Sequence, residues 1–130
     1  MEVYLVSKRV LIIDDEDDIR EVAQASLEMM GGWEVMTASS SSEGLEMAET
    51  RQPDAILLDV MLPDIDGPTT FQKLQAMPAT REIPVVLLTA KVQASDRRRF
   101  ADLGVTAVLS KPFDPVALAG QVAAALGWSL

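Results

Sequence analysis

Short apolar runs alternate along this chain with longer segments in which apolar residues recur at helical spacing. The runs that we predict as strands are residues 8–13, 33–37, 55–58, 85–88 and 105–109. Four of them are apolar over most of their length, which is typical of strands buried on both faces of a sheet. Residues 33–37 alternate between apolar and polar side chains, which predicts a more exposed strand.

A segment with the signals of a helix follows each strand. The first helix stops at Gly31 and Gly32, because glycine accepts the left-handed conformation that is common at helix ends. Ser40 and Glu43 fit a capping box for a second helix, which Gly44 weakens. Their positions predict a short helix that follows the capping serine closely.

The last three helices are predicted from the residues at their beginnings. Pro68 suits the first turn of the third helix, and Ser95 can cap the fourth. Asp114 followed by Pro115 predicts the cap and first turn of the fifth. The apolar stripe of the fifth helix is expected in the core: Val116, Ala119, Val122, Ala123 and Leu126.

Strict alternation of strands and helices predicts an α/β fold, a doubly wound parallel sheet with helices on both faces. Ligands of such sheets bind outside the carboxyl ends of the strands, where the strand order reverses. The 130 residues suit one domain, and nothing in them resembles a linker or a repeat. We therefore expect a single domain over residues 1–130, with no output domain.

The composition of the chain excludes several kinds of catalysis and metal site and disfavours some partners. The chain has no cysteine and no histidine, which excludes thiol or imidazole catalysis and thiolate or imidazole metal ligands from its own side chains. A net charge of −9 disfavours binding to nucleic acid. No apolar run approaches the roughly 18 residues of a membrane span, and the N-terminus lacks the basic start of a signal peptide. We expect a cytoplasmic protein that binds neither nucleic acid nor membrane.

Different polar residues follow four of the predicted strands. Asp14 and Asp15 follow the first strand, Asp59 the third, Thr89 the fourth and Lys111 the fifth. On parallel strands these groups meet at one edge, where they suit a divalent metal, a phosphoryl group and a carboxylate nucleophile. Asp59 can be that nucleophile, although an aspartate that caps a turn is an equally good interpretation of this residue alone.

Asp14 and Asp15 begin a run of five acidic residues. Close carboxylates repel by up to ~4 kcal/mol per pair at an effective dielectric near 20, and a divalent cation offsets that repulsion. A site whose ligands are all oxygen atoms indicates Mg²⁺, or Mn²⁺ in its place. An EF-hand calcium loop is a poor alternative, because Ile19 and Ala25 stand where glycine and glutamate are needed. The other three acids are predicted to complement the dipole of the first helix.

Lys111 can supply an ammonium to a phosphoryl group, and Pro112 can fix its loop, with a cis Lys111–Pro112 bond as one option. Thr89 can donate a hydrogen bond to a phosphoryl oxygen, and Ala90 leaves room for the group. Taken singly, a solvated lysine and an ordinary strand-end threonine stay open as interpretations. The acidic pair, Asp59, Thr89 and Lys111, each after its own strand, indicate a phosphoryl-transfer site much more specifically together than any one of them does.

With these residues in order, the chain resembles the receiver (CheY-like) domain of bacterial two-component response regulators. The matching stretches are residues 10–16, 57–67, 87–91 and 109–113, and the resemblance extends from about Lys8 to Leu126. It implies a flavodoxin-like sheet with strand order 2-1-3-4-5. It also implies a phosphoacceptor signalling domain rather than an enzyme.

The resemblance further implies a role for each residue of the site. Asp59 would accept a phosphoryl group from a phosphohistidine on a sensor histidine kinase or a phosphotransfer protein. Asp15 and Asp59 would ligate Mg²⁺ directly, Asp14 would act mainly through water, and the main-chain carbonyl of Met61 would complete the protein ligands. The phosphoryl oxygens would be bound by residues of the last two strand ends: Thr89, Ala90 and Lys111.

One position departs from the receiver pattern. Val108 stands where receivers usually carry an aromatic ring or a histidine, three residues before the lysine, so this chain lacks the ring to which the threonine is usually coupled. The output surface would be the fourth helix, fifth strand and fifth helix. Arg97, Arg98 and Arg99 on this fourth helix form either a solvated basic face or a docking patch for an acidic partner.

Three alternatives from other classes remain. An aspartate-nucleophile phosphatase of the haloacid dehalogenase type needs a second aspartate at Met61, which this chain lacks. A receiver-like binding module that is never phosphorylated is disfavoured by the retained acidic pair, Asp59, Thr89 and Lys111. A flavin-binding protein of the same fold needs a phosphate-binding loop where the acidic run would repel phosphate.

Overall fold

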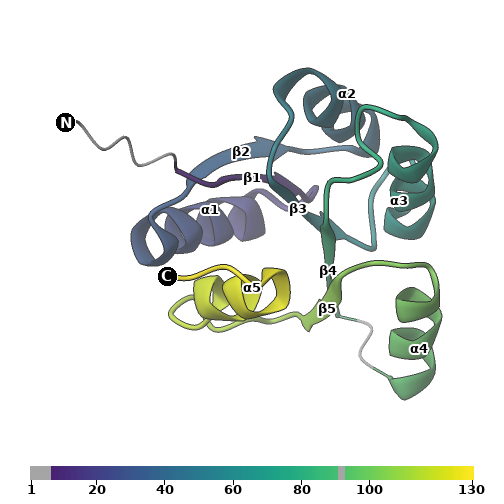
Figure 1. Cartoon of the computed structure of the whole chain (residues 1–130). Helices are drawn as coiled ribbons and strands as arrows, with labels where there is room; N and C mark the ends of the chain where they lie inside the picture. The colour runs from purple at the N-terminus through teal and green to yellow at the C-terminus, as the bar shows by residue number, and fades with distance from the viewer. Residues whose placement is uncertain (1–6, 91–92) are drawn as a thin grey trace.

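The structure is a computed structural model and describes residues 7–90 and 93–130. Strands and helices alternate throughout, as the sequence predicts (Figure 1). In chain order the elements are β1 (Arg9–Ile13), α1 (Asp17–Gly31), β2 (Glu34–Ala38), α2 (Ser41–Arg51), β3 (Ala55–Asp59), α3 (Gly67–Ala76), β4 (Val85–Thr89), α4 (Ala94–Asp102), β5 (Ala107–Ser110) and α5 (Leu118–Leu126).

The five strands form one parallel sheet in the order β2-β1-β3-β4-β5, which confirms the expected α/β fold and strand order. Ile13 at the end of β1 is in register with Leu58, one residue before the end of β3. Thr89 at the end of β4 is in register with Ser110 at the end of β5. This register brings the residues at and just after the four strand ends to one edge of the sheet.

Helices cover both faces of the sheet. Helices α1 and α5 lie side by side on one face, and α2, α3 and α4 lie on the other (Figure 1). The side chains of β1 divide between the two: Val10 and Ile12 join the core under α1 and α5, whereas Leu11 and Ile13 join the other. Both faces are therefore apolar, which explains why the strands are nearly continuous apolar runs.

Local signals correctly predicted several helix ends. Gly32 ends α1 with a left-handed φ of 69°. The Ser40 side chain accepts a hydrogen bond from the Glu43 N–H at the start of α2. Asp66 caps α3 by accepting from the Thr69 N–H at 2.7 Å, with Pro68 in the first turn. Each of these signals depends on groups within a few residues of one another.

Other boundaries differ from the prediction. Helix α4 begins at Ala94 after Gln93, so Ser95 lies inside the first turn and is not the cap. Asp114 instead caps a turn that precedes α5, because its Oδ1 accepts from the Val116 N–H at 2.9 Å. Val116 is 69% exposed and lies outside the core, contrary to our prediction, because α5 begins only at Leu118.

Gly44 has a packing role that the sequence did not reveal. A Cβ atom at this position would lie 2.4 Å from Cδ1 of Ile13, so α2 approaches β1 too closely for a side chain unless Ile13 moves. The glycine weakens the helix intrinsically, but it permits this close contact. Of the described helices, none is both long and apolar enough to cross a membrane.

Candidate functional site

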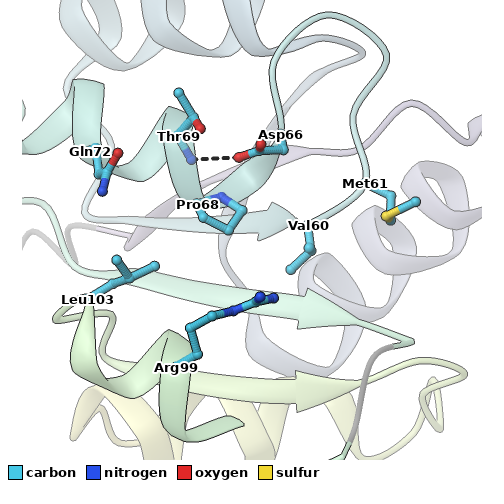
Figure 2. A pocket seen from close by; sticks show the side chains of 8 residues that line it. All are labelled: Val60, Met61, Asp66, Pro68, Thr69, Gln72, Arg99 and Leu103. Carbon is cyan, nitrogen blue, oxygen red and sulfur yellow. Dashed lines mark hydrogen bonds between the residues drawn. The ribbon is translucent and has the colours of Figure 1, made fainter. Parts of the chain in front are cut away.

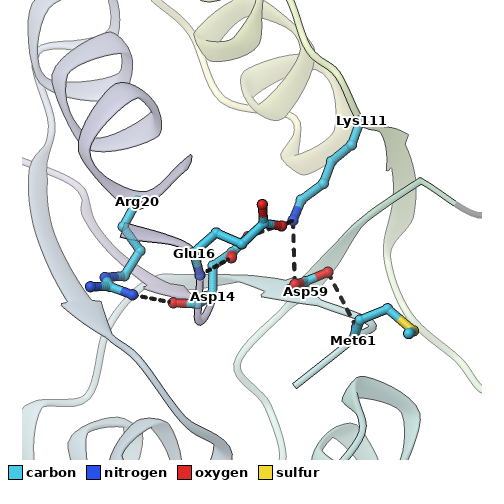
Figure 3. Close-up of polar contacts among 6 residues, drawn as sticks. All are labelled: Asp14, Glu16, Arg20, Asp59, Met61 and Lys111. Atoms are coloured by element: carbon cyan, nitrogen blue, oxygen red, sulfur yellow. Dashed lines mark hydrogen bonds and ion pairs between the residues drawn. The ribbon is translucent and has the colours of Figure 1, made fainter. Parts of the chain in front are cut away.

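Four acidic residues meet at the carboxyl edge of the sheet, beside the β1–β3 boundary where the strand order reverses. Asp14, Asp15, Glu16 and Asp59 each offer one carboxylate oxygen, and these oxygens all lie within 4.8 Å of one another. Lys111 reaches into this group from the end of β5 (Figure 3). We refer to the four acids as the acidic cluster.

The ammonium of Lys111 contacts three of the four acids. Its Nζ lies 2.7 Å from Asp14 Oδ2, and it lies 3.3 Å from both Glu16 Oε1 and Asp59 Oδ2. Burial alone would lower the pKa of Lys111, but close contact with Asp14 and the charges of Asp14 and Asp59 outweigh burial and raise it. Lys111 is therefore held as a cation among carboxylates.

Asp59 is the last residue of β3 and only 3% exposed. Its Oδ1 accepts a hydrogen bond from the Met61 N–H at 3.2 Å, and its Oδ2 faces Lys111. Burial and then the charge of Asp14 raise the pKa of Asp59, whereas Lys111 and the Met61 N–H oppose that rise. The carboxylate is thus buried beside a like charge and stabilised by one cation and one main-chain donor.

Asp14 is 1% exposed and fixed at almost every polar atom. Its N–H donates to Ala38 O on β2, its Oδ1 accepts from the Glu16 N–H at 2.9 Å, and its carbonyl accepts from Arg20. Its Oδ2 is buried and is paired with the Lys111 ammonium at 2.7 Å. The Asp14 carboxylate is therefore held between the start of α1 and the end of β5.

Lys111 and Thr89 are joined through the backbone. The Lys111 N–H donates to the carbonyl of Thr89 at 2.9 Å, and the Lys111–Pro112 bond is cis, the option that the sequence left open. Thr89 ends β4 and is fully buried, whereas Ala90 beyond it is exposed. Lys91, the last residue of the third matching stretch, lies outside the described residues.

Sequence reasoning missed two residues at this site. We predicted Glu16 only as an acid of the first helical turn, but its carboxylate joins the acidic cluster and contacts Lys111. Arg20 was not considered, yet its guanidinium donates to the carbonyl of Asp14 (Figure 3). The spacing of Asp14 and Arg20, which puts Arg20 in the first turn of α1, was the only available signal.

The acidic cluster fits a hard divalent cation. All of its ligand atoms are carboxylate oxygens, the donors that Mg²⁺ prefers. Two of these four acids, Asp14 and Asp59, are buried, so part of the cluster is shielded from solvent. Met61 is exposed at 61% and adjoins the cluster through its N–H contact with Asp59.

A pocket of about 380 Å³ lies beside this site, between α3 and α4 (Figure 2). Val60 and Met61 line it from the loop that follows Asp59, and Arg99 lines it from α4. The pocket does not include the acidic cluster. Of the residues that we predicted for the chemistry, Met61 lines this pocket, whereas the others lie at the strand ends outside its lining.

Comparison with known proteins agrees with this geometry. Residues 10–123 match the family model of the response regulator receiver domain. The alkaline phosphatase synthesis transcriptional regulatory protein PhoP of Bacillus subtilis is 38% identical over 121 residues, which are 93% of this chain and 49% of PhoP. The DNA-binding dual master transcriptional regulator RpaA of Synechocystis is 41% identical over 118 residues, 91% of this chain and 48% of RpaA.

Solved structures show the same fold. A putative response regulator from Chloroflexus aurantiacus is 34% identical with a TM-score of 0.85, covering 94% of this chain and 99% of that one. The chemotaxis protein CheY4 of Vibrio cholerae is 27% identical, also with a TM-score of 0.85, covering 92% and 99%. The chain spans about half the length of the two regulators above. It belongs to the family of response regulator receiver domains.

Proposed function

We propose that Asp59 accepts a phosphoryl group from a phosphohistidine on a sensor histidine kinase or a phosphotransfer protein. One observation carries this proposal: a buried carboxylate at a sheet edge is held against an ammonium inside a cluster of further acids. The chain has no histidine, so the donor imidazole lies outside these 130 residues. The absence of a second acid at Met61 disfavours the phosphatase.

The transfer needs one bond made and one broken. A carboxylate oxygen of Asp59 bonds to phosphorus while the bond between phosphorus and the donor nitrogen breaks, and its electron pair returns to the imidazole. The Nζ of Lys111 lies 3.3 Å from Oδ2 of Asp59, so the ammonium can stabilise the negative charge of the phosphoryl oxygens after transfer. Thr89 would bind another phosphoryl oxygen, and Ala90 would leave space for the group.

We propose Mg²⁺, with Mn²⁺ as a substitute, as the metal of this site. Asp15, Asp59 and the main-chain carbonyl of Met61 would hold it directly, and Asp14 would act through water. When bound, the cation would neutralise negative charge on the phosphoryl group and on Asp59. Glu16 belongs to the same acidic cluster and adds a fourth carboxylate to the field around the ion.

We further propose that the domain is a switch rather than an enzyme and that it acts in the cytoplasm, which its lack of cysteine supports. Residues 1–130 would form one receiver domain, and its output surface would be formed by α4, β5 and α5. Arg97 on α4 donates to Ser110 Oγ at 2.8 Å, next to Lys111, so one arginine of this surface contacts the strand end of the site. A downstream protein would dock there.

Intact mass spectrometry tests the proposed acceptor. After incubation with Mg²⁺ and a small acyl phosphate, we expect one added phosphoryl group that is lost in Asp59→Asn and on chelation of the metal. Asp54→Asn is the matched control, because Asp54 lies just before the other end of the same strand and its side chain binds the Arg9 N–H. This control should be modified like the wild type.

The other outcomes identify the alternatives. An adduct that persists in Asp59→Asn would show that another residue is the acceptor. Rapid turnover of acyl phosphate without a trapped adduct would indicate a phosphatase. No adduct with any donor would indicate a binding module that is not phosphorylated.

A further inference from the structure

Arg20 connects the first helix to the backbone of the acidic cluster. Its guanidinium is largely covered, with the side chain 19% exposed. One nitrogen, Nη1, donates to the carbonyl of Asp14 at 2.8 Å (Figure 3). The other, Nη2, donates to Oδ1 of Asp17. Arg20 does not contact the carboxylates of the acidic cluster in any described interaction.

The hydrogen bonds of Arg20 stabilise the short connection between β1 and α1. Its own N–H donates to the carbonyl of Glu16 at 3.0 Å, and the Glu16 N–H donates to Asp14 Oδ1. The side chain of Arg20 also donates to the carbonyl of Asp14. Arg20 therefore binds the main chain both at Asp14, just after β1, and at Glu16, just before α1. Asp14 is buried, and its carbonyl would lose its donor if Arg20 were removed.

We propose that Arg20 is a positioning residue for the divalent cation of the site. It fixes the main chain at Asp14 and thereby the direction in which Asp14 and Asp15 present their carboxylates. This inference rests on the proposed function, because it concerns the metal that phosphorylation of Asp59 would use. Groups that orient metal ligands without touching the ion typically change metal affinity by 10- to 100-fold when removed.

A charge effect and a positioning effect of Arg20 have opposite signs. Arg20 is a cation near a cation site, so through-space repulsion alone weakens metal binding, and its removal would then tighten Mg²⁺ binding. Loss of positioning would instead weaken Mg²⁺ binding. The direction of the change in affinity therefore separates the two effects.

The experiment compares Arg20→Met, Arg20→Lys and the control Arg9→Met. Arg9 is a matched control because it also donates a guanidinium N–H to a main-chain carbonyl, that of Arg51, and pairs with an acid, Glu34. It lies at the opposite end of β1 from the site. Calorimetric titration with Mg²⁺ alone gives the affinity, and phosphorylation by acyl phosphate at increasing Mg²⁺ gives a half-saturating concentration and a saturated rate.

We expect Arg20→Met to weaken Mg²⁺ binding by about 10-fold and to raise the half-saturating Mg²⁺ concentration equally, with little change in the saturated rate. Arg20→Lys should lie between Arg20→Met and the wild type, since one donor can still reach the carbonyl. Arg9→Met should bind Mg²⁺ like the wild type. If Arg20→Met does not fold, weaker binding by Arg20→Lys supports the proposal, and wild-type binding overturns it.

Two results overturn the inference while leaving the proposed function intact. One is Mg²⁺ binding by Arg20→Met that is equal to or tighter than that of the wild type. The other is an equal loss of affinity in Arg9→Met, which would indicate a general effect on the fold. A wild-type protein that neither binds Mg²⁺ nor becomes phosphorylated would instead overturn the proposed function together with the inference.

Discussion

At the scale of single residues, the site buries two carboxylates close to a single ammonium. Asp14 and Asp59 are both buried, and the charge of Asp14 helps to raise the pKa of Asp59. Lys111 offsets this repulsion by contacting both carboxylates. A buried like-charge pair with a single ammonium is poorly explained by stability alone, and such perturbed groups concentrate at functional sites.

The pKa of Asp64 is lowered, in contrast to that of Asp59, and this difference leads to a prediction. Its carboxylate accepts from the N–H groups of Ser41 and Ser42 at 2.9 and 3.0 Å, at the start of α2. These hydrogen bonds lower the pKa of Asp64 well below its ordinary value, Ser41 contributing most. We expect Asp64→Asn to lower the melting temperature by a few degrees at pH 7.

The sign of the pH dependence follows from linkage. A carboxyl group whose pKa is lowered by folding stabilises the fold fully above its unfolded value of about 3.9, and this stabilisation is lost progressively as the pH falls from that value through the lower pKa of the folded state. The difference between the thermal melts of the wild type and Asp64→Asn should therefore be constant near pH 7 and should narrow progressively below about pH 4. A gap that stays constant down to pH 3 would contradict this account of Asp64.

At the scale of elements, the sequence predicted best what local groups determine. The strand runs, the Ser40 cap and the glycine end of α1 were found because each depends on residues close together in the chain. The predicted starts of α4 and α5 were wrong. Asp114 and Pro115 carry a strong capping signal, but the chain makes a separate turn there before α5 begins at Leu118.

Gly44 gives a prediction at this scale, with a control in another helix. In Gly44→Ala the new methyl group would meet Ile13, and overpacking of this kind costs about 1–3 kcal/mol, which outweighs a helix-propensity gain of up to about 1 kcal/mol. Gly120 in α5 is exposed, and a Cβ atom there would meet Cδ1 of Leu130 at 4.0 Å, an ordinary van der Waals distance. Gly120→Ala should therefore stabilise the fold by about 0.5–1 kcal/mol.

Urea denaturation of both glycine variants measures these opposite changes in the free energy of unfolding. Stabilisation by both substitutions would show that α2 can move away from β1 at little cost. Destabilisation by both would show that helix propensity does not control the outcome at Gly120. Destabilisation by Gly44→Ala together with stabilisation by Gly120→Ala is the result that we expect from a close contact at Gly44.

At the scale of the whole molecule, the sequence predicted which residues meet but not how they are supported. A parallel sheet places strand ends together, so Asp14, Asp59 and Lys111 could be grouped from their order alone. Their supporting contacts carry no such signal. Glu16 and Lys111 are 95 residues apart, and their contact depends on the direction of two side chains, which no sequence pattern specifies.

The same limit applies to the connection between the site and the proposed output surface. Val108 provides no ring, yet Arg97 joins α4 to β5 by donating to the Val108 carbonyl and to Ser110 Oγ. Ser110 directly precedes Lys111, which contacts Asp59. A shift of Lys111 toward a phosphoryl group on Asp59 would therefore act on the strand end that Arg97 holds, and Arg97 would carry the change to α4.

This coupling predicts different behaviour for two neighbouring arginines. Arg97→Gln removes the guanidinium that donates to Val108 and Ser110 of β5, whereas Arg98→Gln makes the same change of charge at a side chain whose described hydrogen bond stays within α4. Phosphorylation of the wild type and Arg98→Gln should change amide exchange in α4 by roughly fivefold or more, the lower range of typical coupling. Arg97→Gln should be phosphorylated to the same extent but show little change in α4. Equal responses of the two variants would exclude Arg97 as the connection, because their charges are the same and only the contact with β5 differs.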